Sequence, residues 1–209
     1  SYLYDQRNTL LQNTLQDTGW TLADDKVLAL KRKIEAAGKP LKEWDVNIYR
    51  GVTTGANEAF IIDNAIKERL CAEDPKSADI IKPLIRGKDI QKYHYDWDGL
   101  WIIALFPALN LDINFYSVVK AYLSSFGAKL AQTGEKGCRK KTNNKWYEIQ
   151  DNTAYYAEFE QPKIIWAEIA KGSCFHYDTN FYYISNTAYM MSGGDLIYLL
   201  GVLNSRVFD

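Results

Sequence analysis

The two histidines of the sequence each precede an aspartate by two residues, in His94-Tyr95-Asp96 and His176-Tyr177-Asp178. Imidazole nitrogens and carboxylate oxygens are metal ligands, so two such pairs could form one metal site. A metal-dependent nuclease needs carboxylates near a lysine, which Asp74-Pro75-Lys76 and the Glu168/Lys171 pair offer. Because 26 acidic and 25 basic residues produce such neighbours by chance, we expect no catalytic residue and no metal site here.

The motifs of methyl transfer and nucleotide binding are also missing from the sequence. Amino-methylation of a DNA base uses an Asn/Asp-Pro-Pro-Tyr/Phe motif, but no two of the five prolines are adjacent. No GxGxxG or Walker loop is present, and residues 51–55 lack the Gly-Lys-Ser/Thr ending of a phosphate-binding loop. We therefore expect no cofactor in this chain.

Basic residues are concentrated in two short segments. Residues 82–92 carry four basic residues and one acidic residue, and residues 136–145 carry five basic residues and no acidic one. Together they hold a net charge of +8 in a chain of net charge −1, which leaves −9 elsewhere. A segregated basic face can bind nucleic acid even on a neutral protein, although a lysine-rich loop is more often simply solvated.

Length and composition place the chain among ordinary globular proteins. It has 209 residues, 47% of them hydrophobic, which suits one generous domain or a domain with an appendage. No apolar run reaches the length of a membrane span. Cys71, Cys138 and Cys174 show no zinc-type spacing, and their odd number predicts reduced thiols in a cytoplasmic protein.

The elements that would carry these residues alternate irregularly between helix and strand. A helix is predicted from Thr21, with Val27, Leu30 and Ile34 on one face, and Gly38 then Pro40 ending it. Residues 46–50 and 58–62 are predicted to form a hairpin with a long tip, and residues 146–149 a further strand. Longer helices are expected over residues 114–131 and 195–205. This mixture, without a regular βαβ order, predicts an α+β fold with no doubly wound Rossmann sheet.

Four segments resemble a known family. Residues 50–62 are similar to its RGxxTGxNxAFxI stretch, residues 81–90 to KPLxRGxDI, residues 162–165 to a PKI strand and residues 199–205 to LLGxLNS. The chain is thereby identified as resembling the TaqI-like C-terminal specificity domains, the target-recognition domains of adenine-N6 DNA methyltransferases and fused type II restriction-modification enzymes. The resemblance covers roughly residues 41–206.

The resemblance implies a sequence-specific module for double-stranded DNA in a bacterial protein. It implies residues 1–40 as a helical connector and residues 41–209 as the recognition domain, which in the family continues past the LNS helix and is therefore expected to be truncated here. The methyltransferase domain of such proteins lies upstream and holds S-adenosylmethionine, with Mg²⁺ an added expectation for a cutting parent. The present chain would place that domain on its target.

Two sets of residues follow from the charge and the resemblance. The glycines and amides of the motifs are expected to shape the backbone, since glycine allows tight turns. They are Gly51, Thr54, Gly55, Asn57, Gly87 and Asn204. The basic segments and their asparagines are expected to contact phosphates and base edges. They are Arg86, Lys88, Lys92, Lys136, Arg139, Lys140, Lys141, Asn143, Asn144 and Lys145.

Two other function classes stay open from the sequence. A protein-interaction domain could use the aromatic residues, 14% of the chain, to dock a partner subunit. A metal-dependent nuclease is the third class. The apolar helix over residues 195–205 is expected to lie at the surface that meets the methyltransferase domain and to cause weak self-association of the isolated chain.

Overall fold

The computed structural model describes residues 23–208 and divides the chain into two units, Ser1–Asp45 and Val46–Asp209. In the described part of the first unit, helix α2 (Asp25–Ala37) precedes a short 3-10 helix, η2 (Leu41–Glu43). Asp24 caps α2 by accepting hydrogen bonds from the backbone N–H groups of Lys26 and Val27. The predicted helix start, Thr21, lies outside the described residues.

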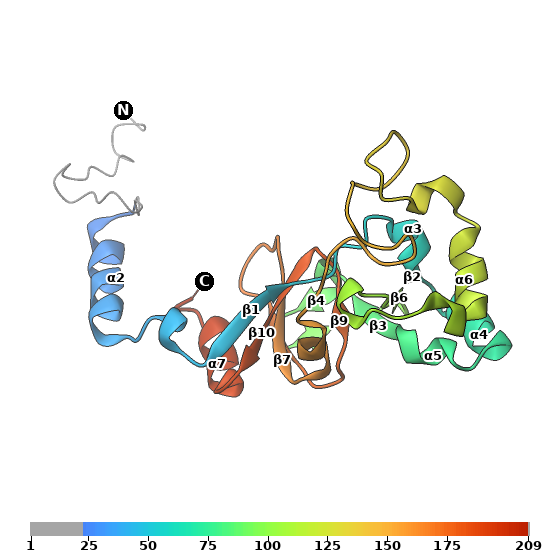
Figure 1. Cartoon of the computed structure of the whole chain (residues 1–209). Coiled ribbons are helices and arrows are strands. Elements are labelled where there is room, and N and C mark those ends of the chain that lie inside the picture. Colours follow the sequence, from blue (N-terminus) through green and yellow to red (C-terminus); the bar gives the residue numbers. More distant parts are fainter. Residues whose placement is uncertain (1–22, 209) are drawn as a thin grey trace, which may run out of the picture. The chain divides into compact units, whose positions relative to one another are not determined.

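The second unit is built on two four-stranded sheets (Figure 1). The first is antiparallel throughout and has the order β1 (Val46–Arg50), β10 (Ala188–Gly193), β7 (Lys163–Ala167), β8 (Phe175–Asp178). The second is mixed and has the order β2 (Ile61–Ile62), β6 (Trp101–Ile103), β3 (Ile81–Ile85), β9 (Tyr183–Ile184), with β3 and β9 parallel. Strands β4 (Ile90–Gln91) and β5 (His94–Tyr95) form a separate hairpin.

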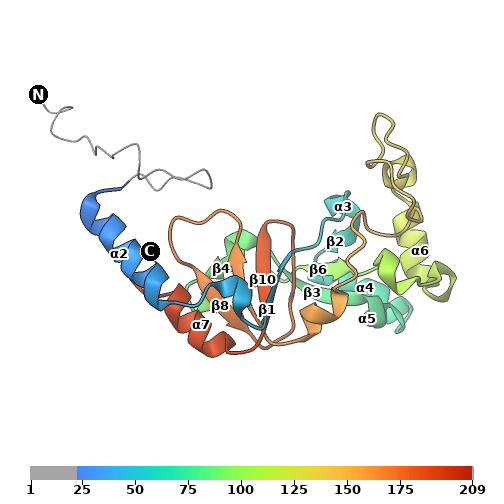
Figure 2. The same ribbon diagram turned by 60° about the vertical axis from the view of Figure 1, so that its left-hand side comes forward.

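The helices of this unit lie in two places (Figure 2). Helices α3, α4, α5 and α6 gather beside the second sheet, and α7 packs against β7, β8 and β10 of the first. Their bounds are α3 (Asn57–Phe60), α4 (Asn64–Glu73), α5 (Ser77–Ile80), α6 (Ser117–Ser124) and α7 (Leu196–Leu203). Short 3-10 helices lie in the connections of this unit: η3 (Gly87–Asp89), η4 (Pro107–Leu109), η5 (Ile113–Phe115), η6 (Gly127–Leu130) and η7 (Tyr156–Glu160). The class is α+β, as predicted.

Local predictions failed where partners distant in sequence decided the structure. The predicted hairpin of residues 46–50 and 58–62 is wrong, because β1 pairs with β10, and residues 57–60 form α3 instead. Ala59 and Phe60 of α3 are completely buried, so packing outweighs the strand pattern there. The expected helix over 114–131 is divided into η5, α6 and η6, and residues 146–149 form a turn.

The core joins both sheets and contains one buried ion pair. Lys163 and Asp178 lie on neighbouring strands, fully buried, with Nζ 2.6 Å from Oδ2. Burial lowers the pKa of Lys163, and Asp178 opposes that shift. Lys163 also donates to the carbonyl of Phe159, and the Asp178 carboxylate accepts from the backbone N–H groups of Asn180 and Tyr182. Both buried charges thus have hydrogen-bond partners besides each other, which a buried ion pair requires.

Candidate nucleic-acid interface

The most basic segment lies in a long irregular loop, residues 131–150, which we call the basic loop. It contains no helix or strand and projects from the second unit, beyond η6, as the gold segment of Figure 1. A loop of this length has many backbone polar groups without partners in secondary structure, and those that are buried must find other partners. The conformation of the basic loop therefore depends on side chains that bind its own backbone.

Arg139 is one of those side chains, and it joins the basic loop to the residues around it. Its residue surface is only 3% exposed, and its guanidinium lies 5.2 Å from the centre of the Phe60 ring. It donates five hydrogen bonds, all to backbone carbonyl oxygens. The acceptors are Leu130 (3.1 and 2.8 Å), Thr54 (3.2 Å), Glu148 (2.7 Å) and Trp146 (2.6 Å).

This position corrects the prediction that Arg139 contacts DNA. A planar guanidinium has five N–H donors, and here all five hydrogen bonds go to the protein backbone. Burial lowers the pKa of Arg139 to about 10. Because this value is still well above 7, the side chain remains charged at neutral pH. Arg139 therefore closes the basic loop onto the domain, and none of its hydrogen-bonding capacity is left for a base edge.

Thr54 and Gly55, from the segment that resembles RGxxTGxNxAFxI, contact the basic loop. Thr54 accepts through its carbonyl from Arg139 and from the backbone N–H of Gln150, at 3.1 Å. Its hydroxyl lies 2.6 Å from Asn57 Oδ1 and accepts from the backbone N–H of Ala56, which holds the turn into α3. Gly55 has φ +76°, and a Cβ there would approach Gln150 and Arg139 to about 3 Å or less.

Three other motif residues permit or make close contacts elsewhere in the fold. A Cβ on Gly51 would lie 2.0 Å from the carbonyl oxygen of Ser185, and one on Gly87 would lie 2.1 Å from that of Thr187. Asn204 at the end of α7 accepts from the backbone N–H of Phe175 and donates to its carbonyl. These residues thus hold chain segments together rather than facing solvent.

The C-terminal half of the basic loop is fixed by amide and carboxylate side chains. Asn144 Nδ2 donates to the carbonyls of Ile149 and Gln150, and Glu148 accepts from the backbone N–H of Lys145 at 2.7 Å. Lys145 Nζ lies 2.7 Å from Asn110 Oδ1 and 3.5 Å from Glu148. Of these, Asn144 and Lys145 were predicted to face DNA, and the structure gives both partners within the protein.

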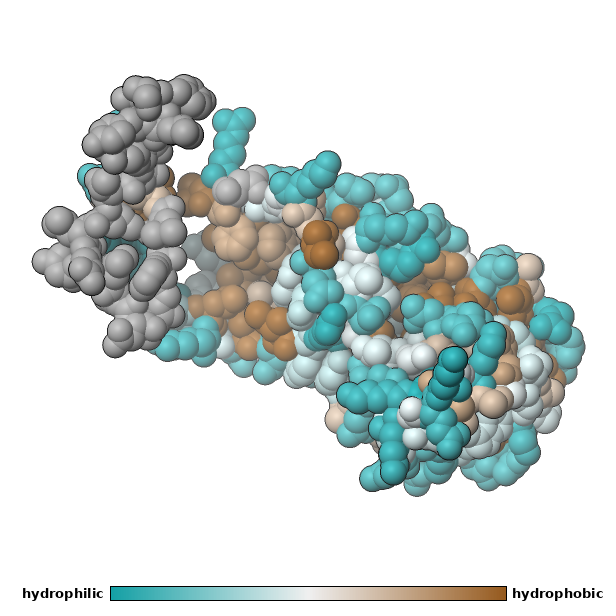
Figure 3. Space-filling view, turned by 90° about the horizontal axis from the view of Figure 1, so that it is seen from above, coloured by the Kyte–Doolittle hydropathy of each residue, from teal (hydrophilic) through white to brown (hydrophobic). Residues whose placement is uncertain are grey.

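Four predicted residues remain on the outside of the basic loop. Lys136, Lys140, Lys141 and Asn143 are all exposed. Hydrophilic side chains cover the part of the second unit that points toward the viewer in Figure 3, where this loop projects. Their amines can reach phosphate oxygens and the Asn143 amide can reach a base edge, because the backbone beneath them is held in place from within.

The segment 82–92 differs, because acidic residues accompany its basic ones. Arg86 pairs with the buried carboxylate of Asp89 at 3.0 Å and with Asp98, and the hydrogen bond to Asp89 contributes most to its raised pKa. Lys88 lies 3.4 Å from Asp98, and Lys82 lies 3.5 Å from Glu160. Lys92 is exposed. The charge of this segment is thus largely balanced by carboxylates, two of which lie outside it in sequence.

The two His-x-Asp pairs do not come together as a set of metal ligands within residues 23–208. His94 lies 3.1 Å from Asp96, and the Tyr95 ring contacts both imidazoles, that of His176 edge-on at 4.9 Å. Burial lowers the pKa of His176. Glu168 pairs with Arg50 at 3.0 Å. Over residues 23–208, no three His, Cys, Asp or Glu side chains are grouped to hold a metal ion, and Cys71, Cys138 and Cys174 are free thiols.

Sequence reasoning missed two amides that hold the basic loop, Gln132 within the loop and Asn110 outside it. Gln132 donates to the carbonyls of Lys145 and Glu148, and Asn110 binds the Lys145 amine. Both are isolated amides with no motif around them, so no sequence signal could have identified them.

None of the helices within residues 23–208 has the length and apolar character to cross a membrane.

The chain has been compared with protein families, with curated proteins and with solved structures. Residues 82–209 match the family model of the TaqI-like C-terminal specificity domain. The chain is 28% identical over 178 residues to the Type II methyltransferase M.PaeR7I of Pseudomonas aeruginosa, over 84% of this chain and 29% of that protein. The Type IIL restriction-modification enzyme MmeI, in a structure with DNA, matches with TM-score 0.45 and 13% identity, over 80% of this chain and 21% of that one. The chain thus spans less than a third of either protein.

Proposed function

The chain belongs to the family of TaqI-like C-terminal specificity domains, and from this premise we propose that it recognises a specific sequence in double-stranded DNA. The observation that carries the proposal is the basic loop, whose exposed lysines stand on a backbone fixed by the buried Arg139. A loop ordered before binding loses less conformational entropy when DNA binds, so it can discriminate between sequences.

The contacts divide between phosphates and bases. Lys136, Lys140 and Lys141 are the phosphate ligands, because flexible amines give position and affinity without reading sequence. Asn143 is the candidate base reader, since an amide can pair bidentately with adenine in the major groove. Lys88 and Lys92 assist as exposed cations, and Arg86, held by two carboxylates, serves mainly to position Asp89.

We propose further that the module serves an adenine-specific DNA methyltransferase, or a fused type II restriction-modification enzyme, in the bacterial cytoplasm. The resemblance to M.PaeR7I supports a methyltransferase, and that protein is more than three times as long as the matched region. The methyl donor S-adenosylmethionine would bind a different domain, which this chain orients on the target. Incubating the chain with duplex DNA, labelled S-adenosylmethionine and Mg²⁺ should leave the DNA unlabelled and uncut. Stoichiometric methyl transfer by this chain would contradict the proposal that S-adenosylmethionine binds a different domain.

Selection from a library of random duplexes is the direct test of sequence recognition. Duplexes retained by the chain at moderate salt should converge on one sequence of a few base pairs. That sequence and a scrambled version then serve in binding titrations across a salt series. Retention without convergence would reduce the proposal to unspecific binding.

The phosphate ligands are tested with a triple variant, Lys136→Ala/Lys140→Ala/Lys141→Ala. Each lost phosphate contact lowers the slope of log K against log salt by about 0.9, so the slope should fall by up to about 2.7 for both duplexes. The control variant is Lys42→Ala/Lys76→Ala/Lys171→Ala, which removes the same charge from exposed positions elsewhere. Equal losses in the two variants would show that net charge, and not the basic loop, drives binding. Asn143→Ala should instead cost about 1–3 kcal/mol on the selected sequence alone.

A further inference from the structure

One acidic side chain lies at the tip of the basic loop, among its lysines. Residues 131–150 contain two acidic residues, of which Glu148 is buried and bound to Lys145. The other, Glu135, is exposed and directly precedes Lys136. Within the described part of the chain, the Glu135 carboxylate has neither an ion pair nor a hydrogen bond. The loop proposed to meet phosphates thus also presents a negative group.

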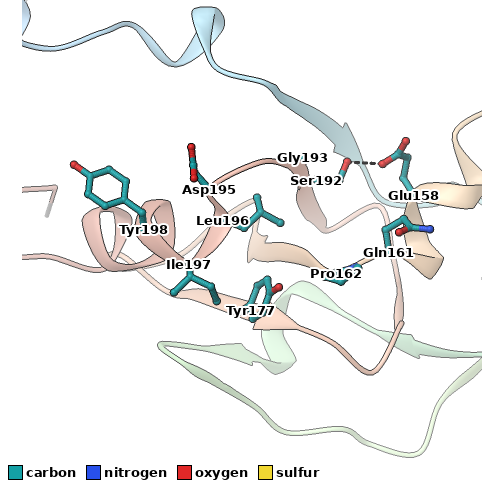
Figure 4. A pocket seen from close by; sticks show the side chains of 10 residues that line it. All are labelled: Glu158, Gln161, Pro162, Tyr177, Ser192, Gly193, Asp195, Leu196, Ile197 and Tyr198. Carbon is teal, nitrogen blue, oxygen red and sulfur yellow. Dashed lines mark hydrogen bonds between the residues drawn. The ribbon is translucent and has the colours of Figure 1, made fainter.

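Carboxylates elsewhere in the second unit have structural partners. Glu158 lines a pocket beside α7 and accepts a hydrogen bond from the Ser192 hydroxyl (Figure 4). Glu168 pairs with Arg50 at 3.0 Å. Each of these two side chains ties together chain segments that are distant in sequence, whereas Glu135 makes no such contact within residues 23–208.

The backbone that carries Glu135 is held by a short ladder of hydrogen bonds. The Gly134 N–H donates to the Arg139 carbonyl, and the Arg139 N–H donates to the carbonyl of Ala131, both at 2.9 Å. The Glu135 carbonyl accepts from the Cys138 N–H at 3.0 Å. Because the Arg139 guanidinium is bound to carbonyls inside the domain, this ladder sets the position of Glu135 before any ligand binds.

The lysines proposed to contact phosphates lie directly beside Glu135. Lys136 is its neighbour in sequence, and a Cβ added at Gly134 would lie 3.3 Å from the Cβ of Lys141. A carboxylate brought to DNA by these amines is repelled by the phosphates, since like charges repel. It can only accept hydrogen bonds, and in the major groove the donors are the amino groups of cytosine and adenine. The tip therefore favours a base edge that presents such a donor.

We infer that Glu135 is a specificity-determining residue that accepts a hydrogen bond from the N4 amino group of one cytosine in the recognised duplex. The inference rests on the proposed function. Cytosine fits better than adenine, because adenine presents the acceptor N7 beside its amino group, and a carboxylate has no donor for it. Guanine and thymine present acceptor oxygens, which repel a carboxylate, so Glu135 both selects one base and rejects others.

Parallel selections from random duplexes test the inference. The parent sequence should contain a C·G pair at which Glu135→Gln no longer prefers cytosine. On the parent sequence, Glu135→Gln should bind about 5- to 150-fold more weakly, whereas on a scrambled duplex it should bind equally or more tightly, because one repulsive charge is gone. Glu73→Gln makes the same change at an exposed residue at the end of α4, and it should select the parent sequence.

A change in the DNA gives a second measurement that misfolding cannot imitate. The cytosine identified by selection is replaced by a pyrimidinone base that lacks the exocyclic amino group. The unmodified protein should lose affinity by a similar factor to that of Glu135→Gln on the natural duplex. Glu135→Ala should lose little on the same replacement, because it has no carboxylate to accept the missing hydrogen bond. Equal losses for the two proteins would overturn the inference.

The selections also separate failure of the inference from failure of the proposed function. If the parent protein selects one sequence and Glu135→Gln selects the same one, or binds every duplex more tightly by one factor, Glu135 is a solvated charge and only the inference fails. A selected sequence without a C·G pair has the same consequence. If the parent protein selects no sequence, sequence recognition fails and the inference fails with it. Both glutamine variants should melt as the parent does.

Discussion

Residues 82–92 and residues 136–145 both carry an excess of basic side chains, but the fold treats them in opposite ways. In the first segment, carboxylates from Asp89, Asp98 and Glu160 accompany the cations at 3.0–3.5 Å or closer. In the second, one arginine turns inward to backbone carbonyls, and the lysines at 136, 140 and 141 remain exposed. A count of charges along the sequence does not distinguish these two situations.

The difference separates two roles for an arginine. Arg86 meets carboxylates, so it stabilises a turn and neutralises its surroundings. Arg139 donates hydrogen bonds only to backbone carbonyls, so it organises the basic loop without pairing with a carboxylate. The basic loop is therefore the better candidate for meeting phosphates, because its lysines keep their charge for a partner.

The largest expected effect comes from Arg139→Met. This change removes all five hydrogen bonds of the guanidinium, including those to the carbonyls of Leu130 and Trp146, whereas the Thr54 and Glu148 carbonyls keep a second donor in Gln150 and Gln132. Each unsatisfied buried carbonyl costs about 1–3 kcal/mol, so we expect a loss of about 3 kcal/mol in the free energy of unfolding. Urea denaturation measures it. Arg139→Lys should fail almost as badly, since an ammonium cannot reproduce the planar set of donors. Lys140→Met is the matched control, and an equal loss in that variant would contradict the buried role of Arg139.

A smaller loss of stability is expected from Arg86→Ala. Asp89 is buried, and without Arg86 its charge loses the closest partner, which should cost about 1–3 kcal/mol. The same urea titration applies, with Lys92→Ala as an exposed control within the segment. DNA binding should change less than in the triple lysine variant. A stable Arg86→Ala protein with a lowered salt slope would instead return Arg86 to the DNA face.

The two adjacent asparagines of the basic loop, Asn143 and Asn144, should differ in how much their substitution lowers stability. Asn144→Ala removes two hydrogen bonds to the carbonyls of Ile149 and Gln150, for a loss of about 1–2 kcal/mol. Asn143→Ala, at an exposed position, should stay within about 0.5 kcal/mol of the parent. Thermal unfolding of both variants decides between them. If both lose stability equally, Asn143 has a structural role and is not free to read a base.

The smallest effect is expected where a carboxylate is removed. Asp98→Asn should remove the closer of the two carboxylates beside Lys88, at 3.4 Å, and leave Asp89 at 3.7 Å from Lys88 and paired with Arg86, so stability falls by about 1 kcal/mol at most. The salt slope of DNA binding should rise by up to about 0.9 if Lys88 then meets a phosphate. Asp45→Asn, the same change at another residue, controls for net charge. An unchanged slope in both would place residues 82–92 away from the DNA.

The local sequence determined much of this protein. Short sequence segments led to the family, namely those similar to RGxxTGxNxAFxI, KPLxRGxDI and LLGxLNS. The irregular alternation of predicted helices and strands led to the α+β class. These features depend on backbone conformations and periodicities that near neighbours impose. The basic loop was also evident as a segment, since five basic residues within ten favour a solvent-exposed loop. Its lysines at 136, 140 and 141 are indeed exposed.

Only the tertiary structure decided which basic residues remain available. Arg139 is one basic residue among five in sequence, and it turns inward because carbonyls of Thr54, 85 residues earlier, and of Leu130 and Glu148 converge on one buried point. Strand β1 likewise pairs with β10, more than 130 residues away, instead of with its neighbour. Such choices depend on which distant backbone groups are left unpaired and must be satisfied on burial. That requirement arises only when the chain is folded, so no local pattern records it.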